Sequence, residues 1–177
     1  PASRPDSLPT PAADRRVTDG AARTAIITIH SAQLPMDDPL MIANADQLLA
    51  WDVQDFVNHA EGYDGSVVVF HAPEQDFKWS YARIRGRQIS QIAEKNPISE
   101  WATAGIYYWK HTEDFLRSAS EMIALDDRTN GEFYVAPSYQ YLIRERKKIV
   151  PYTINAMHMH GLGTPSDLEK YLALAKK

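Results

Sequence analysis

The stretch Pro39–Gln47 reads Pro-Leu-Met-Ile-Ala-Asn-Ala-Asp-Gln. It joins a short apolar run to a polar loop, a pattern typical of a buried strand that ends in a turn. Further apolar runs predict strands at residues 66–71, 102–110 and 148–154, with helical patterns between them. Strands that alternate with helices, and whose apolar runs are continuous, indicate an α/β fold. We therefore expect a Rossmann-like, mostly parallel sheet flanked by helices.

Local signals refine some of these elements. Residues 21–34 fit either a strand or a buried helix, because periodicity alone does not separate the two. Two patterns that alternate around Arg85-Gly86-Arg87 predict a hairpin. Asp52 and Thr112 stand where helix N-caps are expected, and residues 133–146 fit one further helix.

The composition fits one folded domain. The chain has 177 residues, of which 44% are hydrophobic, enough material for one core. Residues 1–16 include four prolines and little apolar material, so we expect a flexible tail there and a single α/β domain over residues 17–177.

The charge and the absence of cysteine exclude several function classes. A net charge of −4 argues against binding to a nucleic-acid backbone. No apolar run approaches the roughly 20 residues that a membrane span needs, so no membrane partner is expected. A chain without cysteine has no disulfide, no thiolate zinc site and no cysteine nucleophile. This composition fits a cytoplasmic protein.

Asp46 is a candidate metal ligand. It follows a predicted buried strand, and ligands of α/β sheets bind beyond the carboxyl ends of the strands. Mg²⁺ prefers oxygen ligands and commonly takes few of them from the protein. The alternative is a turn cap, a role that aspartate often has in such loops.

Other short segments could meet a ligand. Lys95 stands beside Glu94 and shortly before a proline, where it could present its charge to a phosphate or simply face solvent. The small residues of Asp19-Gly-Ala-Ala22 allow either close approach to a ligand or tight packing. Glu132 could accept hydrogen bonds from sugar hydroxyls or cap the helix that follows it.

Two histidines suggest an alternative chemistry. His158 and His160 stand at alternating positions and would share one side of a strand, as a pair of zinc ligands does. With Asp46 they could form a metal-dependent hydrolase. The alternative is a pair of hydrogen-bonded histidines without a metal.

Taken in order, these segments resemble the sugar-phosphate nucleotidyltransferases (nucleotide-sugar pyrophosphorylases), in particular the branch of capsule and surface-polysaccharide synthesis. The resemblance runs from about residue 18 to residue 174. Six short motifs carry it: Asp19-Gly-Ala-Ala22, Ile42-Ala-Asn-Ala-Asp46, Ile92-Ala-Glu-Lys-Asn-Pro97, Ala104-Gly-Ile-Tyr107, Asn130-Gly-Glu-Phe-Tyr134 and Gly161-Leu-Gly-Thr-Pro165.

The resemblance implies a nucleotide-diphospho-sugar transferase fold and assigns roles to residues. Asp46 would hold Mg²⁺, and Lys95, with its neighbour Glu94, would hold the sugar phosphate. These two, Asp46 and Lys95, are the implied catalytic residues. The remaining implied substrate contacts are Asp19, Gly20 and Ala21 at the nucleotide base, and Gly105 and Glu132 at the sugar.

The implied reaction joins a nucleoside triphosphate to a sugar 1-phosphate, or to a similar phosphorylated acceptor, and releases pyrophosphate. The chain departs from the pattern at two points. The Gly-rich loop that grips the triphosphate should precede Asp19, so the resemblance implies an N-terminally truncated domain. Gly161 stands where many relatives carry a second metal-binding aspartate. A non-catalytic nucleotide-sugar-binding or regulatory module is therefore the alternative. A sheet without its first strand leaves an open edge, which predicts a homo-oligomer.

Overall fold

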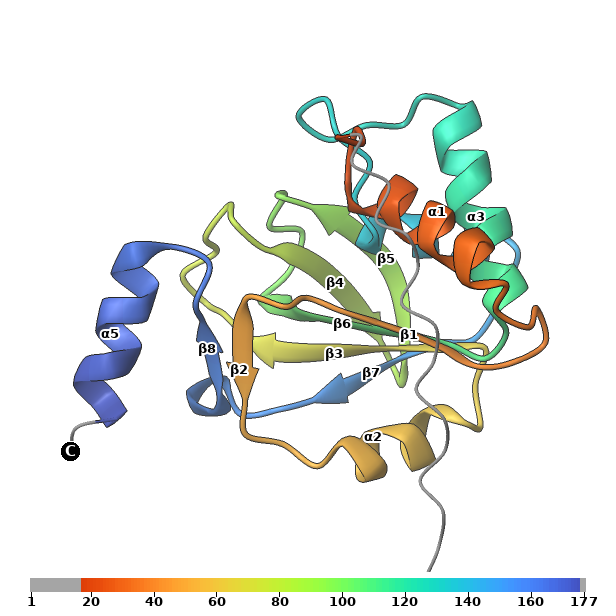
Figure 1. The fold of residues 1–177 in the computed structure, drawn as a ribbon. Coiled ribbons are helices and arrows are strands. Elements are labelled where there is room, and N and C mark those ends of the chain that lie inside the picture. The colour runs from red at the N-terminus through yellow and green to blue at the C-terminus, as the bar shows by residue number, and fades with distance from the viewer. Residues whose placement is uncertain (1–16, 176–177) are drawn as a thin grey trace, which may run out of the picture.

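The computed structural model describes residues 17–175, so the predicted tail at residues 1–16 lies outside the described residues (Figure 1). The helices are α1 (Ala21–Ala32), α2 (Val53–Ala60), α3 (Thr112–Ala124), α4 (Tyr139–Arg144) and α5 (Pro165–Ala175), with 3₁₀ turns η1 (Ala136–Ser138) and η2 (Ala156–His158). The strands are β1 (Leu40–Ala43), β2 (Gln47–Leu49), β3 (Gly65–His71), β4 (Ser80–Arg85), β5 (Gln88–Glu94), β6 (Trp101–Trp109), β7 (Ile149–Thr153) and β8 (Met159–Gly161).

A six-stranded sheet forms the centre of the molecule. Its strands follow the order β5-β4-β6-β3-β7, and β1 pairs with β6 as well. Strands β2 and β8 form a separate antiparallel pair. The α/β class is confirmed, but the expected strand direction is wrong. Within the main sheet, β3 and β7 are the parallel pair, and the other pairs of described strands are antiparallel.

Short connections explain the antiparallel pairing. The predicted hairpin is confirmed, because β4 and β5 are joined by the two-residue turn Gly86-Arg87. The segment 95–100 joins β5 to β6 and is likewise too short for the crossover that parallel neighbours require. The connection from β6 to β7 is long and carries α3 and α4, and β7 then lies parallel to β3.

The continuous apolar runs arise because both faces of the sheet are covered. Along β3, Val67 and Val69 belong to one buried cluster, whereas Val68 and Phe70 belong to another. The first cluster includes residues of α1, α3 and α4, and the second includes residues of α2. Figure 1 shows α1 and α3 on one side of the sheet and α2 on the other. Burial on both faces therefore produces the same sequence pattern in antiparallel strands as in parallel ones.

The helix signals are confirmed in part. Residues 21–32 form a helix, and Asp52 caps α2 by accepting hydrogen bonds from the next turn. The expected Thr112 cap is wrong, because Thr112 is the first helical residue and its hydroxyl donates to the carbonyl of Asp38 instead. The helix expected over residues 133–146 is shorter, because η1 precedes α4.

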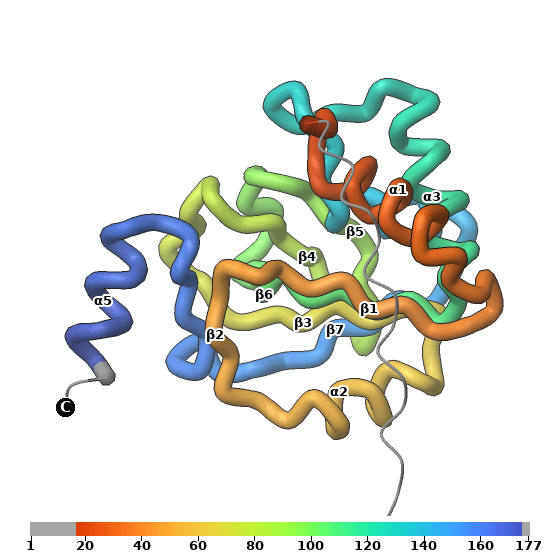
Figure 2. Tube along the Cα trace, in the orientation of Figure 1, coloured from red at the N-terminus to blue at the C-terminus, as the bar shows by residue number. Residues whose placement is uncertain are grey.

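Helix α5 stands at the side of the domain, beyond the β2–β8 pair (Figure 2). Its contact with β8 includes the rings of Tyr171 and His160, whose centroids lie 5.2 Å apart. No helix within residues 17–175 has the length and apolar character that crossing a membrane would require.

Candidate functional site

A pocket of about 790 Å³ opens between the central sheet, the β2–β8 pair and α5. This volume lies within the range of small-molecule sites. Five residues to which the family resemblance gives a role line it together, namely Ala21, Asp46, Glu94, Lys95 and Gly105. They come from the start of α1, the loop after β1, the end of β5 and the middle of β6, so the fold brings distant segments to one cavity.

Asp19 and Gly20 lie outside this lining. The Asp19 carboxylate pairs with Arg23 at 2.6 Å and with Arg128 at 3.1 Å. Gly20 lies directly against the backbone of Phe133, whose N–H donates to the Asp19 carbonyl at 2.8 Å. These contacts hold the start of α1 in place, and the predicted contact with a nucleotide base stays a prediction.

Lys95 is held by its neighbours at the end of β5. Its backbone has φ 50° in the left-handed region, and its N–H donates to the Trp79 carbonyl at 3.0 Å. The ammonium group donates to the Tyr134 hydroxyl at 2.6 Å and lies 4.7 Å from the centre of that ring. The hydrogen bond with Tyr134 raises the pKa of Lys95, and the nearby carboxylates of Glu94 and Glu132 raise it further. Because its pKa is raised, Lys95 stays positively charged beside these two carboxylates. Glu132 itself is exposed and lies outside the lining.

Glu94 is the buried carboxylate of the pocket, with 9% of its surface exposed. Burial raises its pKa, while a hydrogen bond donated by the Ser80 hydroxyl and the charge of Lys95 act in the opposite direction. Tyr107 lies close by, and burial raises its pKa to about 12, so its hydroxyl stays protonated. The pocket therefore holds a carboxylate acceptor beside hydroxyl groups, an arrangement suited to a polyhydroxylated ligand.

The loop after β1 is fixed by contacts with β6 and with the segment before α5. The Asn44 N–H donates to the Gly105 carbonyl at 2.9 Å. A side chain at Gly105, whose φ is +66°, would meet the Asn44 amide nitrogen at 2.4 Å, so glycine is required there. The Asp46 carbonyl accepts from the Leu162 N–H at 2.7 Å, and its exposed carboxylate lies against Gly163. Asp46 is thereby presented at the mouth of the pocket.

The described residues contain no group of three or more His, Cys, Asp or Glu side chains that could hold a metal ion. His158 belongs to η2 and His160 to β8, so they do not share one strand face as expected. The hydrolase hypothesis therefore has no third ligand within residues 17–175. A lone exposed carboxylate such as Asp46 does fit Mg²⁺, provided that water and substrate phosphates complete its coordination.

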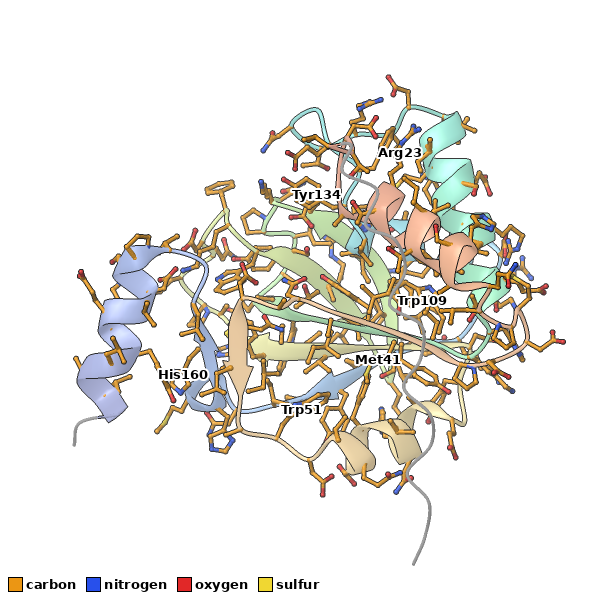
Figure 3. All side chains as sticks on the ribbon, in the orientation of Figure 1. Arg23, Met41, Trp51, Trp109, Tyr134 and His160 are labelled. Atoms are coloured by element: carbon orange, nitrogen blue, oxygen red, sulfur yellow. The ribbon has the colours of Figure 1, made fainter. Side chains whose placement is uncertain are left out.

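Several pocket residues were missed by sequence reasoning. Tyr134 was given no role from the sequence, and His160 was considered only as a zinc ligand. They lie on two sides of the cavity, near the start of α1 and beside α5 respectively (Figure 3). Trp79 also lines it, with its ring 5.4 Å from that of Phe70. Ser80 faces Glu94 across the β4–β5 pair. The register of the predicted hairpin was the signal that could have identified this partner.

Solved structures place this arrangement among known folds. A nucleoside-diphosphate-sugar pyrophosphorylase from Vibrio cholerae RC9 matches with a TM-score of 0.76 and 26% identity over 88% of this chain. The fold is a sugar nucleotidyltransferase fold. It is shared with a protein from Bacillus anthracis described as a glucose-1-phosphate thymidylyltransferase (TM-score 0.69, 18% identity) and with a UDP-glucose pyrophosphorylase (TM-score 0.69, 16% identity), each over 92% of this chain.

The chain spans less than two thirds of each of these nucleotidyltransferase structures. It covers 66% of the Vibrio protein, 63% of the Bacillus protein and 62% of the UDP-glucose pyrophosphorylase. A comparison with protein-family models finds no match. A comparison with curated protein sequences finds none either.

Proposed function

We propose that this domain serves nucleotidyl transfer from a nucleoside triphosphate to a sugar 1-phosphate or a similar phosphorylated acceptor. The observation that supports it is one pocket, in a sugar nucleotidyltransferase fold, that collects Asp46, Glu94 and Lys95. The resemblance further suggests a cytoplasmic reaction whose product enters surface-polysaccharide synthesis.

In this reaction the chain aligns the two substrates and neutralises their negative charge. A phosphate oxygen of the acceptor attacks the α-phosphorus of the triphosphate, a new P–O bond forms, and the bond to the leaving pyrophosphate breaks. Lys95 neutralises the acceptor phosphate so that two anions can approach, and its hydrogen bond to Tyr134 keeps the ammonium group in place. The buried carboxylate of Glu94 accepts hydrogen bonds from ligand hydroxyls in the pocket.

Mg²⁺ is the expected cofactor. Asp46 would hold it at the pocket mouth, where the ion would supply charge neutralisation to the phosphates. The loop contacts of Asn44 and Leu162 serve to aim the Asp46 carboxylate.

A non-catalytic nucleotide-sugar-binding or regulatory module is the second candidate. It is favoured by the position of Gly161, which stands where many relatives of the resembled family have a second metal-binding aspartate. Such a module would bind nucleotide sugars through the same pocket and release no pyrophosphate.

The deciding experiment measures Mg²⁺-dependent pyrophosphate release across all nucleoside triphosphates and a panel of sugar 1-phosphates. Asp46→Asn tests the pocket carboxylate, and Asp37→Asn is the matched control because Asp37 is exposed and outside the pocket lining. We expect release that is lost in Asp46→Asn and kept in Asp37→Asn. Binding of nucleotide sugars without any release would replace transfer by the binding module.

A further inference from the structure

A second pocket, of about 420 Å³, lies between the β4–β5 hairpin and the end of α4. Four basic side chains line it: Arg85 and Arg87 from the hairpin, and Arg146 and Lys147 from the segment after α4. Among the residues that the structure describes, no aspartate and no glutamate lines it. Because the whole chain carries a net charge of −4, this cluster is a local concentration of positive charge.

Three of these cationic side chains have no ion-pair partner within residues 17–175. Arg85, Arg87 and Arg146 are exposed, and none forms a salt bridge with another residue of the described range. Arg83, two positions before Arg85, differs. It donates to the Gln91 side chain at 2.8 Å and to the Ile98 carbonyl at 3.0 Å. The same hairpin thus contains one arginine that holds the structure together and two whose guanidinium groups have no such contact within residues 17–175.

The fourth cation stabilises the wall of the pocket. The Lys147 ammonium lies 3.3 Å from the Asp114 carboxylate and 3.8 Å from that of Asp64. The floor is apolar, since Ile89 is 3% exposed and Ile143 is partly buried. The combination of apolar residues with several guanidinium groups resembles a binding site, because ligand pockets combine a hydrophobic lining with a few placed polar groups.

We propose that this second pocket binds a small oligophosphate, a linear di- or triphosphate. Guanidinium groups form paired hydrogen bonds with phosphate oxygens, and three of them around one pocket match several phosphates better than one. A monovalent anion would leave most of the positive charge unbalanced.

The dipole of α4 is too weak to oppose this binding. A helix C-terminus carries about half a negative charge, and α4 has only six residues. Stabilisation of that helix end accounts for a basic residue at Arg146. It does not account for Arg85 and Arg87, which belong to the hairpin.

The second pocket is separate from the first. Gln88 at the start of β5 lines the second pocket, whereas Glu94 at its end lines the first. A strand of seven residues spans roughly 20 Å, so an oligophosphate in one pocket does not reach the other. The proposal is therefore independent of nucleotidyl transfer.

The test is calorimetric titration with inorganic tripolyphosphate and pyrophosphate, in the presence of a chelator and without any sugar phosphate. We expect both to bind more tightly than inorganic phosphate. The double variant Arg87→Glu/Arg146→Glu should bind at least about tenfold more weakly. Lys110→Glu/Lys148→Glu is the matched control, because both lysines are exposed, lie outside the two linings and carry the same change of charge.

Backbone amide chemical shifts locate the bound anion. The proposal requires shifts at Ser90 and Ile143, which line the second pocket. Shifts confined to Lys95 and Tyr134 would place the anion in the first pocket and overturn it. Equal weakening in the control variant would overturn it as well, because that result indicates attraction by general charge.

Discussion

At the residue scale, Tyr134 sets both the position and the pKa of the Lys95 ammonium group. The Tyr134 hydroxyl is the largest cause of the raised pKa of Lys95, and it fixes where the ammonium group points. The two residues are 39 positions apart, so the pairing is a product of the fold.

Tyr134→Phe tests this pair, because it keeps the ring and removes the hydroxyl. We expect the pKa of Lys95 to fall and the affinity for sugar 1-phosphates to drop about tenfold, since a hydrogen bond to a charged group is lost. Isothermal titration calorimetry measures the affinity. Tyr63→Phe, a partly buried tyrosine outside the pocket lining, should bind as the original chain does. Unchanged affinity in Tyr134→Phe would exclude a positioning role.

Glu94 predicts a pH dependence of stability. Burial raises its pKa above the value of 4.5 expected for an exposed glutamate, so the folded state binds this proton more tightly than the unfolded state. The free energy of unfolding should therefore fall as pH rises from about 4.5 through the folded pKa. Glu94→Gln lacks the carboxyl group and should show a smaller fall. Urea unfolding between pH 4 and 7 measures this, with Glu74→Gln as an exposed control, and superimposable curves for Glu94→Gln and the original chain would refute it.

The residues found from the sequence and those missed differ in how their signal is encoded. Asp46 and Lys95 stand at strand ends, a position that a local pattern reveals. Tyr134 reaches the pocket because the segment before η1 packs beside the end of β5, and no local pattern reports that contact. The sequence therefore reveals site residues whose position depends on a single strand or helix. It does not reveal those whose position depends on how two elements pack together.

At the element scale, the start of α1 shows how a backbone contact fixes a helix. Gly20 has φ +131°, and a β-carbon there would lie 2.4 Å from the Phe133 carbonyl oxygen. The Ala22 N–H donates to the same oxygen at 3.0 Å. The helix therefore begins where two backbones approach too closely for any side chain.

Gly20→Ala should lower the free energy of unfolding by about 2–3 kcal/mol, because it adds both steric overlap and backbone strain. The matched control is Gly62→Ala, where an added β-carbon meets nothing within 4 Å. We expect the control to change stability by at most about 0.5 kcal/mol. Urea denaturation followed by circular dichroism measures both, and equal stability of the two variants would contradict the argument.

The elements themselves were predictable where one segment decides them. Hydrophobic runs located β3, β6 and β7, and the Gly86-Arg87 turn located a hairpin. Strand direction was not predictable, because buried β3 contributes to both core clusters whether its neighbours are parallel or antiparallel. The prediction that Thr112 caps a helix was wrong because its hydroxyl donates to the Asp38 carbonyl, 74 positions away. The local sequence does not show this contact.

At the scale of the whole molecule, the sheet has an open edge at β1. This strand pairs with β6 and has no second strand partner among residues 17–175. Met41 is 45% exposed and Ala43 is exposed on the same strand (Figure 3). Unpaired strand edges with apolar side chains are templates for pairing with another chain.

We expect this edge to pair with a second copy of the chain, so that the protein forms a dimer or a larger assembly in solution. Met41→Lys places a charge on the edge and should raise the dissociation constant about tenfold or more. Met36→Lys is the matched control, because Met36 is 38% exposed but lies outside any strand. Light scattering coupled to size exclusion measures the mass of each. A monomer in the unsubstituted chain would show that four residues of edge are too little to hold two copies. Weaker assembly in both variants would trace association to general apolar surface, whereas weakening in Met41→Lys alone assigns it to β1.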